Sequence, residues 1–205
     1  MASEKGVRKK IGKLEVVSIS LIALAVLCDA LMTTFYIYDI MFAVLALMSL
    51  AFLFGGIGCG LLVHGLPDKN NIFALNYNTF FWGSLGVALL AAAQFPLVLM
   101  NLSIYNLAVL DPLGIKLFLF AQAVAEECFF AYFLYSYFRK ISFPAIGNFA
   151  CATIFMIMHA AVYNVSTPVL LVVFVSRIIL NIIYDLGGLG SSMFAHVIVN
   201  LVAGG

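Results

Sequence analysis

The chain has 205 residues, of which 65% are hydrophobic and only 9% are charged, and its mean hydropathy is +1.15. These values lie outside the range of soluble globular domains and indicate a protein that folds in lipid. The formal net charge of +1 provides no strongly basic surface, so no nucleic-acid partner is expected. The composition predicts an integral, multi-pass membrane protein, which we expect in a prokaryotic cell membrane.

Seven apolar runs are long enough, or nearly so, to cross about 30 Å of hydrocarbon as helices. They cover residues 16–38, 41–63, 79–100, 113–138, 143–163, 168–184 and 191–203, the last run being short. The first run follows a basic start but contains no small-residue cleavage site, so we expect an uncleaved span and not a signal peptide. The predicted fold class is all-α, a polytopic transmembrane helical bundle with about seven transmembrane helices.

The distribution of basic residues predicts a cytoplasmic N-terminus. With this orientation the inner side holds Arg8, Lys9, Lys10, Lys13, Lys69, Arg139 and Lys140. The expected outer segments, around Asp39 and at 101–111 and 164–167, contain no Lys or Arg, as the positive-inside rule requires. Lys116 and Arg177 are the exceptions, and either can reach the interface or a carboxylate partner.

Titratable side chains within the spans are few, and they are the candidates for function. A charged group in hydrocarbon costs several kcal/mol unless it is paired, which directs attention to Asp29, Glu126, Glu127, His159, Arg177 and His196. Asp29 and Arg177 are expected to stabilise helix contacts or to line a watery cavity rather than to perform chemistry.

Glu126 and Glu127 are predicted to lie near the bilayer midplane. They stand about 13 residues from Arg139, which places them roughly 20 Å from the end of their helix. Adjacent residues differ by about 100° around a helix, so both carboxyls cannot face one site squarely. We therefore expect one to act as a base and the other to have a structural role.

The histidines complete a hydrolytic constellation. His159 lies deep in the next span, at a depth similar to that of Glu126, and His196 and Asn200 share one helix face because they are four residues apart. We infer that Glu126 and His159 polarise a water that attacks a carbonyl. His196 and Asn200 would hold the developing oxyanion, giving hydrolysis without a covalent intermediate. The sequence contains neither HExxH nor GxSxG, so zincin and serine-hydrolase signatures are absent.

The predicted depth of His196 in the membrane does not fit this arrangement. Counted from Gly190, His196 lies only about 9 Å below the inner end of its helix, against about 20 Å for Glu126. Either segment 187–190 dips into the protein, or the helix boundaries differ from the predicted ones by several residues.

Three short motifs, in this order, resemble those of the CPBP family, which includes the type II CAAX prenyl endopeptidases. The EE motif is Glu126-Glu127, the FxxxH motif runs from Phe155 to His159, and the HxxxN motif runs from His196 to Asn200. The resemblance covers roughly residues 111–203. Together with the basic start and the apolar runs, it divides the chain into a basic cytoplasmic segment at 1–15, three transmembrane helices in 16–110 and a CPBP-like catalytic core in 111–205.

The resemblance implies an intramembrane glutamate protease that uses no metal or other cofactor. In the family pattern Glu126 is the general base and His159 assists it. His196 and Asn200 form the oxyanion hole, and Glu127 is the supporting carboxylate. The implied partner is a membrane-associated protein or peptide, of which prenylated CAAX proteins are the family example.

The first motif departs from the family pattern at one position. The family motif is usually EExxxR, and Ala131 occupies the arginine position. This leaves Glu127 without the expected cation, and Arg177 from another span is the candidate to replace it.

Three alternatives remain open at this stage. Glu and His at the midplane also serve proton-coupled transporters, although the paired broken helices of such proteins are not evident. Two His and two Glu can bind zinc or iron. A catalytically inactive relative that acts as an immunity or scaffold protein would keep the same motifs.

Overall fold

A computed structural model describes residues 2–37, 41–65, 76–99, 112–163 and 167–203, and these ranges are almost entirely helical. The helices are α1 (Ala2–Ile37), α2 (Met41–His64), α3 (Tyr77–Leu99), α4 (Pro112–Glu126), the π-helix η1 (Glu127–Tyr135), α5 (Ser136–Ile141), α6 (Pro144–Tyr163), α7 (Thr167–Gly187) and α8 (Leu189–Ala203). No strand occurs in the described ranges. The predicted all-α fold is confirmed.

The apolar helices agree with the predicted spans. Five stretches are long and apolar enough to cross a membrane, namely Leu14–Met32, Ala46–His64, Tyr77–Leu99, Leu113–Ile141 and Thr167–Gly187. Two apolar helices, Pro144–Ala160 and Leu189–Val202, are shorter. The protein is a polytopic helical membrane bundle whose helices correspond to the seven predicted runs.

The predicted orientation and division of the chain stay predictions. Asp39, Lys69, segment 101–111 and residues 164–166 lie outside the described residues. Helix α1 begins at Ala2, so the segment predicted as a basic N-terminus belongs to the first helix.

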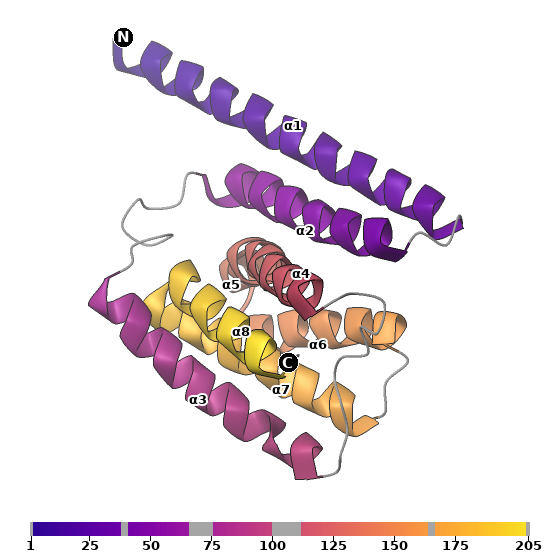
Figure 1. Cartoon of the computed structure of the whole chain (residues 1–205). Coiled ribbons are helices and arrows are strands. Elements are labelled where there is room, and N and C mark those ends of the chain that lie inside the picture. Colours follow the sequence, from indigo (N-terminus) through magenta and orange to yellow (C-terminus); the bar gives the residue numbers. More distant parts are fainter. Residues whose placement is uncertain (1, 38–40, 66–75, 100–111, 164–166, 204–205) are drawn as a thin grey trace.

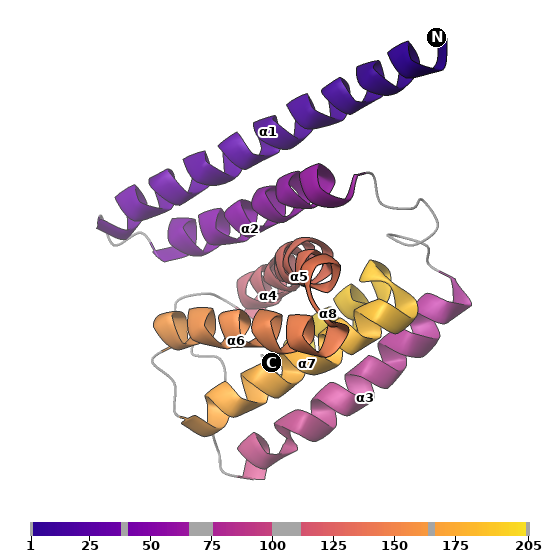
Figure 2. The same ribbon diagram turned by 180° about the vertical axis from the view of Figure 1, so that it is seen from behind.

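The helices form successive layers around a central one (Figure 1). Within the described part of the chain α1 contacts only α2, and α2 covers the continuous helix formed by α4, η1 and α5. On its other side this central helix contacts α6, α7 and α8, and α3 packs against α7 and α8 from outside. Figure 2 shows the same order from behind. The central helix carries both glutamates, so the candidate site lies inside the bundle.

The central helix changes from α to π geometry at the glutamate pair. Glu126 is the last residue of α4, and Glu127 is the first residue of η1. At its end the Ser136 N–H donates to Ala131 O, five residues earlier. Wider π turns occur mostly in short pieces within α-helices and often at functional sites.

A glycine lets α2 approach the π-helix backbone directly. An added Cβ on Gly56 would lie 2.5 Å from Cys128 C and 2.5 Å from Phe129 N, which is closer than real side-chain atoms come. A Cβ on Gly55 would meet Ala25 Cβ at 3.5 Å, an ordinary contact. Small residues allow this close helix approach in membranes, and α2 thereby supports the peptide groups that follow Glu127.

Polar contacts hold one end of the bundle. Arg139 forms an ion pair with Asp185, which also accepts a hydrogen bond from Tyr135 Oη at 2.5 Å. Lys140 Nζ donates to Val63 O at 2.8 Å. These contacts join α5 and η1 to α7 and to the end of α2.

The turn between α7 and α8 bears on the depth of His196. Gly188 adopts a φ of +80°, a conformation that favours glycine, and α8 starts at Leu189, two residues before the predicted run. Within segment 187–190 Leu189 is buried, whereas the three glycines are partly exposed. The helix boundary therefore differs slightly from the predicted one, and the dip of this segment stays a prediction.

Replacing Gly56 by Ala is expected to destabilise the fold by about 1–3 kcal/mol, because the added methyl collides with backbone that cannot rotate away. Thermal unfolding in detergent measures the effect. Gly55→Ala is the matched control and should be neutral or slightly stabilising, because alanine favours helix. Equal melting temperatures for the two variants would contradict the close approach.

Candidate active site

A buried ion pair joins the second glutamate to α7. Arg177 Nη1 donates to Glu127 Oε1 at 2.6 Å, and Arg177 Nη2 donates to Glu127 Oε2 at 3.0 Å. Both side chains are 0% exposed. The two parallel bonds match the fork of the guanidinium to the carboxylate, the strongest form of such a pair. Arg177 thus provides the cation that the family pattern expects at position 131.

The rest of the guanidinium is also engaged. Arg177 Nε donates to Asn181 Oδ1 at 2.9 Å, and Asn181 Nδ2 donates to Asn148 Oδ1 at 2.7 Å. The Phe155 ring centroid lies 5.5 Å from Arg177 Cζ, within range of a cation–π contact. Ala131 is fully buried in an apolar cluster with Leu189 and Met193. The cation that pairs with Glu127 therefore lies on α7 and not on the central helix.

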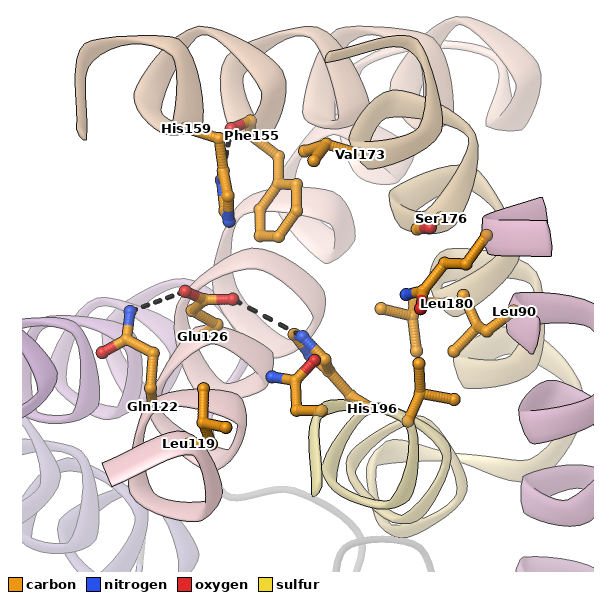
Figure 3. A pocket seen from close by; sticks show the side chains of 13 residues that line it. Leu90, Leu119, Gln122, Glu126, Phe155, His159, Val173, Ser176, Leu180 and His196 are labelled. Atoms are coloured by element: carbon orange, nitrogen blue, oxygen red, sulfur yellow. Dashed lines mark hydrogen bonds and ion pairs between the residues drawn. The ribbon is translucent and has the colours of Figure 1, made fainter. Parts of the chain in front are cut away.

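His196 lies between the two carboxylates. Its Nδ1 is 2.9 Å from Glu127 Oε1, and its Nε2 is 3.7 Å from Glu126 Oε2. Because a carboxylate oxygen only accepts, His196 Nδ1 carries the proton in the first contact. Figure 3 shows the imidazole of His196 directed at Glu126 across the cavity. The glutamates therefore separate in role, with Glu127 held by α7 and α8 and Glu126 facing open space.

His159 approaches from the opposite wall. Its Nδ1 donates to Phe155 O at 2.9 Å, one turn earlier on α6, and its ring lies against the Phe155 ring with centroids 4.1 Å apart. Figure 3 shows the ring extending toward Glu126. With Nδ1 donating, Nε2 of a neutral ring presents a lone pair.

Two residues that the sequence reasoning missed hold Glu126. Gln122 Nε2 donates to Glu126 Oε1 at 2.6 Å, and Ser49 Oγ donates to Gln122 Oε1 at 2.6 Å. The sequence does contain a sign of this contact, because Gln122 lies four residues before Glu126 in an apolar helix. Residues at positions i and i+4 share one helix face.

These side chains surround a cavity of about 40 Å³, enough for a small number of waters. Its polar lining consists of Gln94, Gln122, Glu126, His159, Ser176, His196 and Asn200. Asn200, one turn after His196, is 5% exposed. Ser176 Oγ is buried and has no hydrogen-bond partner among the described residues. The four predicted catalytic residues thus line one cavity.

Other predicted candidates lie elsewhere. Asp29 is on α1, which in the described part of the chain contacts α2 and no further helix, and Lys116 is exposed on α4. Among the described residues no group of three or more His, Cys, Asp or Glu side chains is arranged to hold a metal ion.

Replacing Arg177 by Ala is expected to destabilise the protein by about 3–5 kcal/mol, because it leaves the Glu127 carboxylate buried without a partner. Adding Glu127→Gln removes that charge and should recover most of the lost stability. Unfolding in detergent measures both variants. Arg139→Ala, whose ion pair is 44% and 27% exposed, is the control and should cost about 0–1 kcal/mol.

The segment that contains these residues is similar to a known protein family. Residues 108–202 match the family described as type II CAAX prenyl endopeptidase Rce1-like. No curated protein and no solved structure matches the chain. The matched segment contains all three motifs and Arg177. The resemblance found in the sequence is therefore confirmed, and residues 108–202, somewhat less than half of the chain, are similar to the Rce1-like type II CAAX prenyl endopeptidases.

Proposed function

We propose that this protein is a metal-independent intramembrane endopeptidase that hydrolyses a peptide bond near the terminus of a membrane-associated protein. The observation that carries the proposal is a cavity of water size enclosed by Glu126, His159 and His196. The match of residues 108–202 to a protease family supports a protease. The choice of glutamate chemistry rests on the arrangement of these side chains.

Glu126 and His159 are suited to activate water. Glu126 Oε1 is already occupied by the Gln122 amide, so Oε2 is the oxygen that can accept a proton from water. His159 holds its own proton at Nδ1 against Phe155 O, so its Nε2 can accept a hydrogen bond from the same water. A base and an acceptor on opposite walls orient the water oxygen toward a substrate.

His196 and Asn200 are suited to bind an oxyanion. The Glu127 carboxylate orients the His196 ring through Nδ1, so that Nε2 faces the cavity beside Glu126, where a proton on Nε2 would be donated to the oxyanion. The amide of Asn200 lines the same cavity one turn later. Donors held in place before the reaction stabilise the charge that develops on the carbonyl oxygen.

The hydrolysis then proceeds in two steps. The water oxygen bonds to the scissile carbonyl carbon as its proton passes to Glu126, and the carbonyl oxygen becomes the oxyanion. The carbon–nitrogen bond breaks when the oxyanion collapses, and the proton on Glu126 passes to the leaving amine. The products are a carboxylic acid and an amine, which become a carboxylate and an ammonium group when the acid proton passes to the amine, and Glu126 returns to its starting state.

Apolar space beside the catalytic cavity supports a lipid-anchored substrate. One space adjoins Glu126 and His159 and is walled by Met48, Phe52 and Met158. A larger cavity of about 370 Å³ lies between α2 and α4. A prenylated CAAX protein is the substrate class we test first. The prokaryotic membrane expected from the sequence stays a prediction.

Glu126→Gln and His159→Ala are each expected to lower kcat for a fluorogenic farnesylated CAAX peptide. Loss of the base should cost about 100- to 10,000-fold. The wild type should keep its rate in the presence of a chelator. Purified protein in detergent, assayed with and without chelator, provides the measurement.

Asp29→Asn is the control for this assay, because it changes a carboxylate on α1 outside the cavity. Full activity of Glu126→Gln in a folded protein would refute the proposed base. Loss of wild-type activity on chelation, restored by zinc or iron, would instead support a metal site.

Ser176→Ala tests whether the buried hydroxyl binds substrate. One hydrogen bond is worth about 0.5–1.5 kcal/mol, so KM should rise by about 2- to 12-fold with kcat nearly unchanged, the pattern of lost uniform binding. Initial rates over a range of peptide concentrations separate the two constants. Unchanged KM would show that the hydroxyl does not contact the peptide.

A further inference from the structure

A hydrogen-bonded chain runs from the second helix to the predicted base. Ser49 on α2 donates to the carbonyl oxygen of Gln122, and the Gln122 amide nitrogen donates to Glu126 Oε1, both at 2.6 Å. Ser49, Gln122 and Glu126 are 7%, 4% and 4% exposed. Figure 3 shows the last bond of this chain at the edge of the catalytic cavity.

The Glu126 carboxylate determines which way the amide of Gln122 faces, and the serine holds the amide in place. If the amide were reversed, its carbonyl oxygen would face the carboxylate of Glu126, and two acceptors would repel each other. With Nε2 toward Glu126, the amide oxygen accepts the hydrogen bond from Ser49 Oγ, which fixes the other side of the amide. Ser49 therefore acts on Glu126 through Gln122.

The hydrogen bond from Gln122 restricts the orientation of the Glu126 carboxylate. With Oε1 bound to an amide, the carboxylate cannot rotate freely, and Oε2 remains on the side of the cavity and of His196. The same oxygen then meets the water in each catalytic cycle. Buried groups held within a few tenths of an ångström are what proximity catalysis needs.

We propose that Ser49 and Gln122 are positioning residues for Glu126. The proposal rests on the proposed function. It also assigns a catalytic contribution to α2, which lies before the family segment 108–202.

A purely structural role for the Ser49 bond is less consistent with the other contacts of α2. This helix already packs on the π-helix at Gly56. Its end is held by Tyr132 Oη, which donates to Gly65 O at 3.0 Å, and by Lys140. Loss of one hydroxyl should therefore leave α2 in place.

The kinetic test compares three variants on the farnesylated peptide. Gln122→Met keeps the side-chain length without the amide and should lower kcat by about 10- to 100-fold, since it removes a bond to a charged group. Ser49→Ala should lower kcat by about 3- to 10-fold. KM should change by less than about two-fold in both variants. Ser49→Thr should recover the rate, because it keeps the hydroxyl and Ser49 borders the 370 Å³ cavity, where a methyl fits.

The double variant Ser49→Ala/Gln122→Met shows whether the two residues act through one hydrogen-bonded chain or independently. If Ser49 acts through Gln122, Ser49→Ala should cause no additional loss in the Gln122→Met background. Multiplied losses, or a rise in KM without a fall in kcat, would overturn the proposal. Ser18→Ala is the control, because it removes another buried hydroxyl, on α1, that bonds its own helix.

A spectroscopic measurement tests the same contact without substrate. The infrared difference between wild type and Glu126→Gln isolates the carboxylate stretching band of Glu126. We expect this band to shift in Gln122→Met and in Ser49→Ala and to return in Ser49→Thr. An unshifted band would overturn the positioning role. If the band shifts but the wild type cleaves no peptide, the proposed function fails while the positioning role stands.

Discussion

The ion pair between Arg177 and Glu127 is the contact on which the arrangement of the site depends. It joins α7 to the central helix with both groups fully buried, and its carboxylate also orients His196 on α8. Through Asn181 the same arginine is linked to Asn148 on α6. A buried carboxylate needs charged and hydrogen-bonding partners. Four helices therefore share one network, and the orientation of His196 follows from it.

The change from α to π geometry explains how two adjacent glutamates obtain different surroundings. In a regular α-helix a residue four positions after Glu127 would share its face, which is where the family pattern has arginine. In this chain that position is Ala131, buried against α8, and Glu127 turns to α7 instead. Gly56 supports this geometry by admitting α2 to the backbone beside Glu127. The small residues Gly56 and Ala131 thus both permit the packing around the π-helix η1.

Much of this could be predicted from the sequence, because membrane helices are long and their few charges are conspicuous. Runs of apolar residues predicted every span, and the rarity of titratable groups identified Glu126, His159 and His196. The π-helix could not be predicted, since the segment from Glu127 to Tyr135 has no proline or glycine to mark it. Gln122 and Ser49 were overlooked because neutral polar residues in spans usually serve as interhelical bonds, and only three-dimensional contact distinguishes the two uses. The start of α8 at Leu189 follows the positive φ of Gly188, which the apolar pattern of the sequence does not reveal.

The two histidines illustrate how the surroundings orient one residue type in two ways. His159 donates from Nδ1 to a backbone carbonyl, and its ring extends toward Glu126 from α6. His196 donates from Nδ1 to the Glu127 carboxylate and approaches Glu126 with Nε2 from α8. The two rings therefore reach Glu126 from opposite walls of the cavity, which is the arrangement that the proposed hydrolysis would use. The Glu127 carboxylate fixes one ring, and the Phe155 backbone fixes the other.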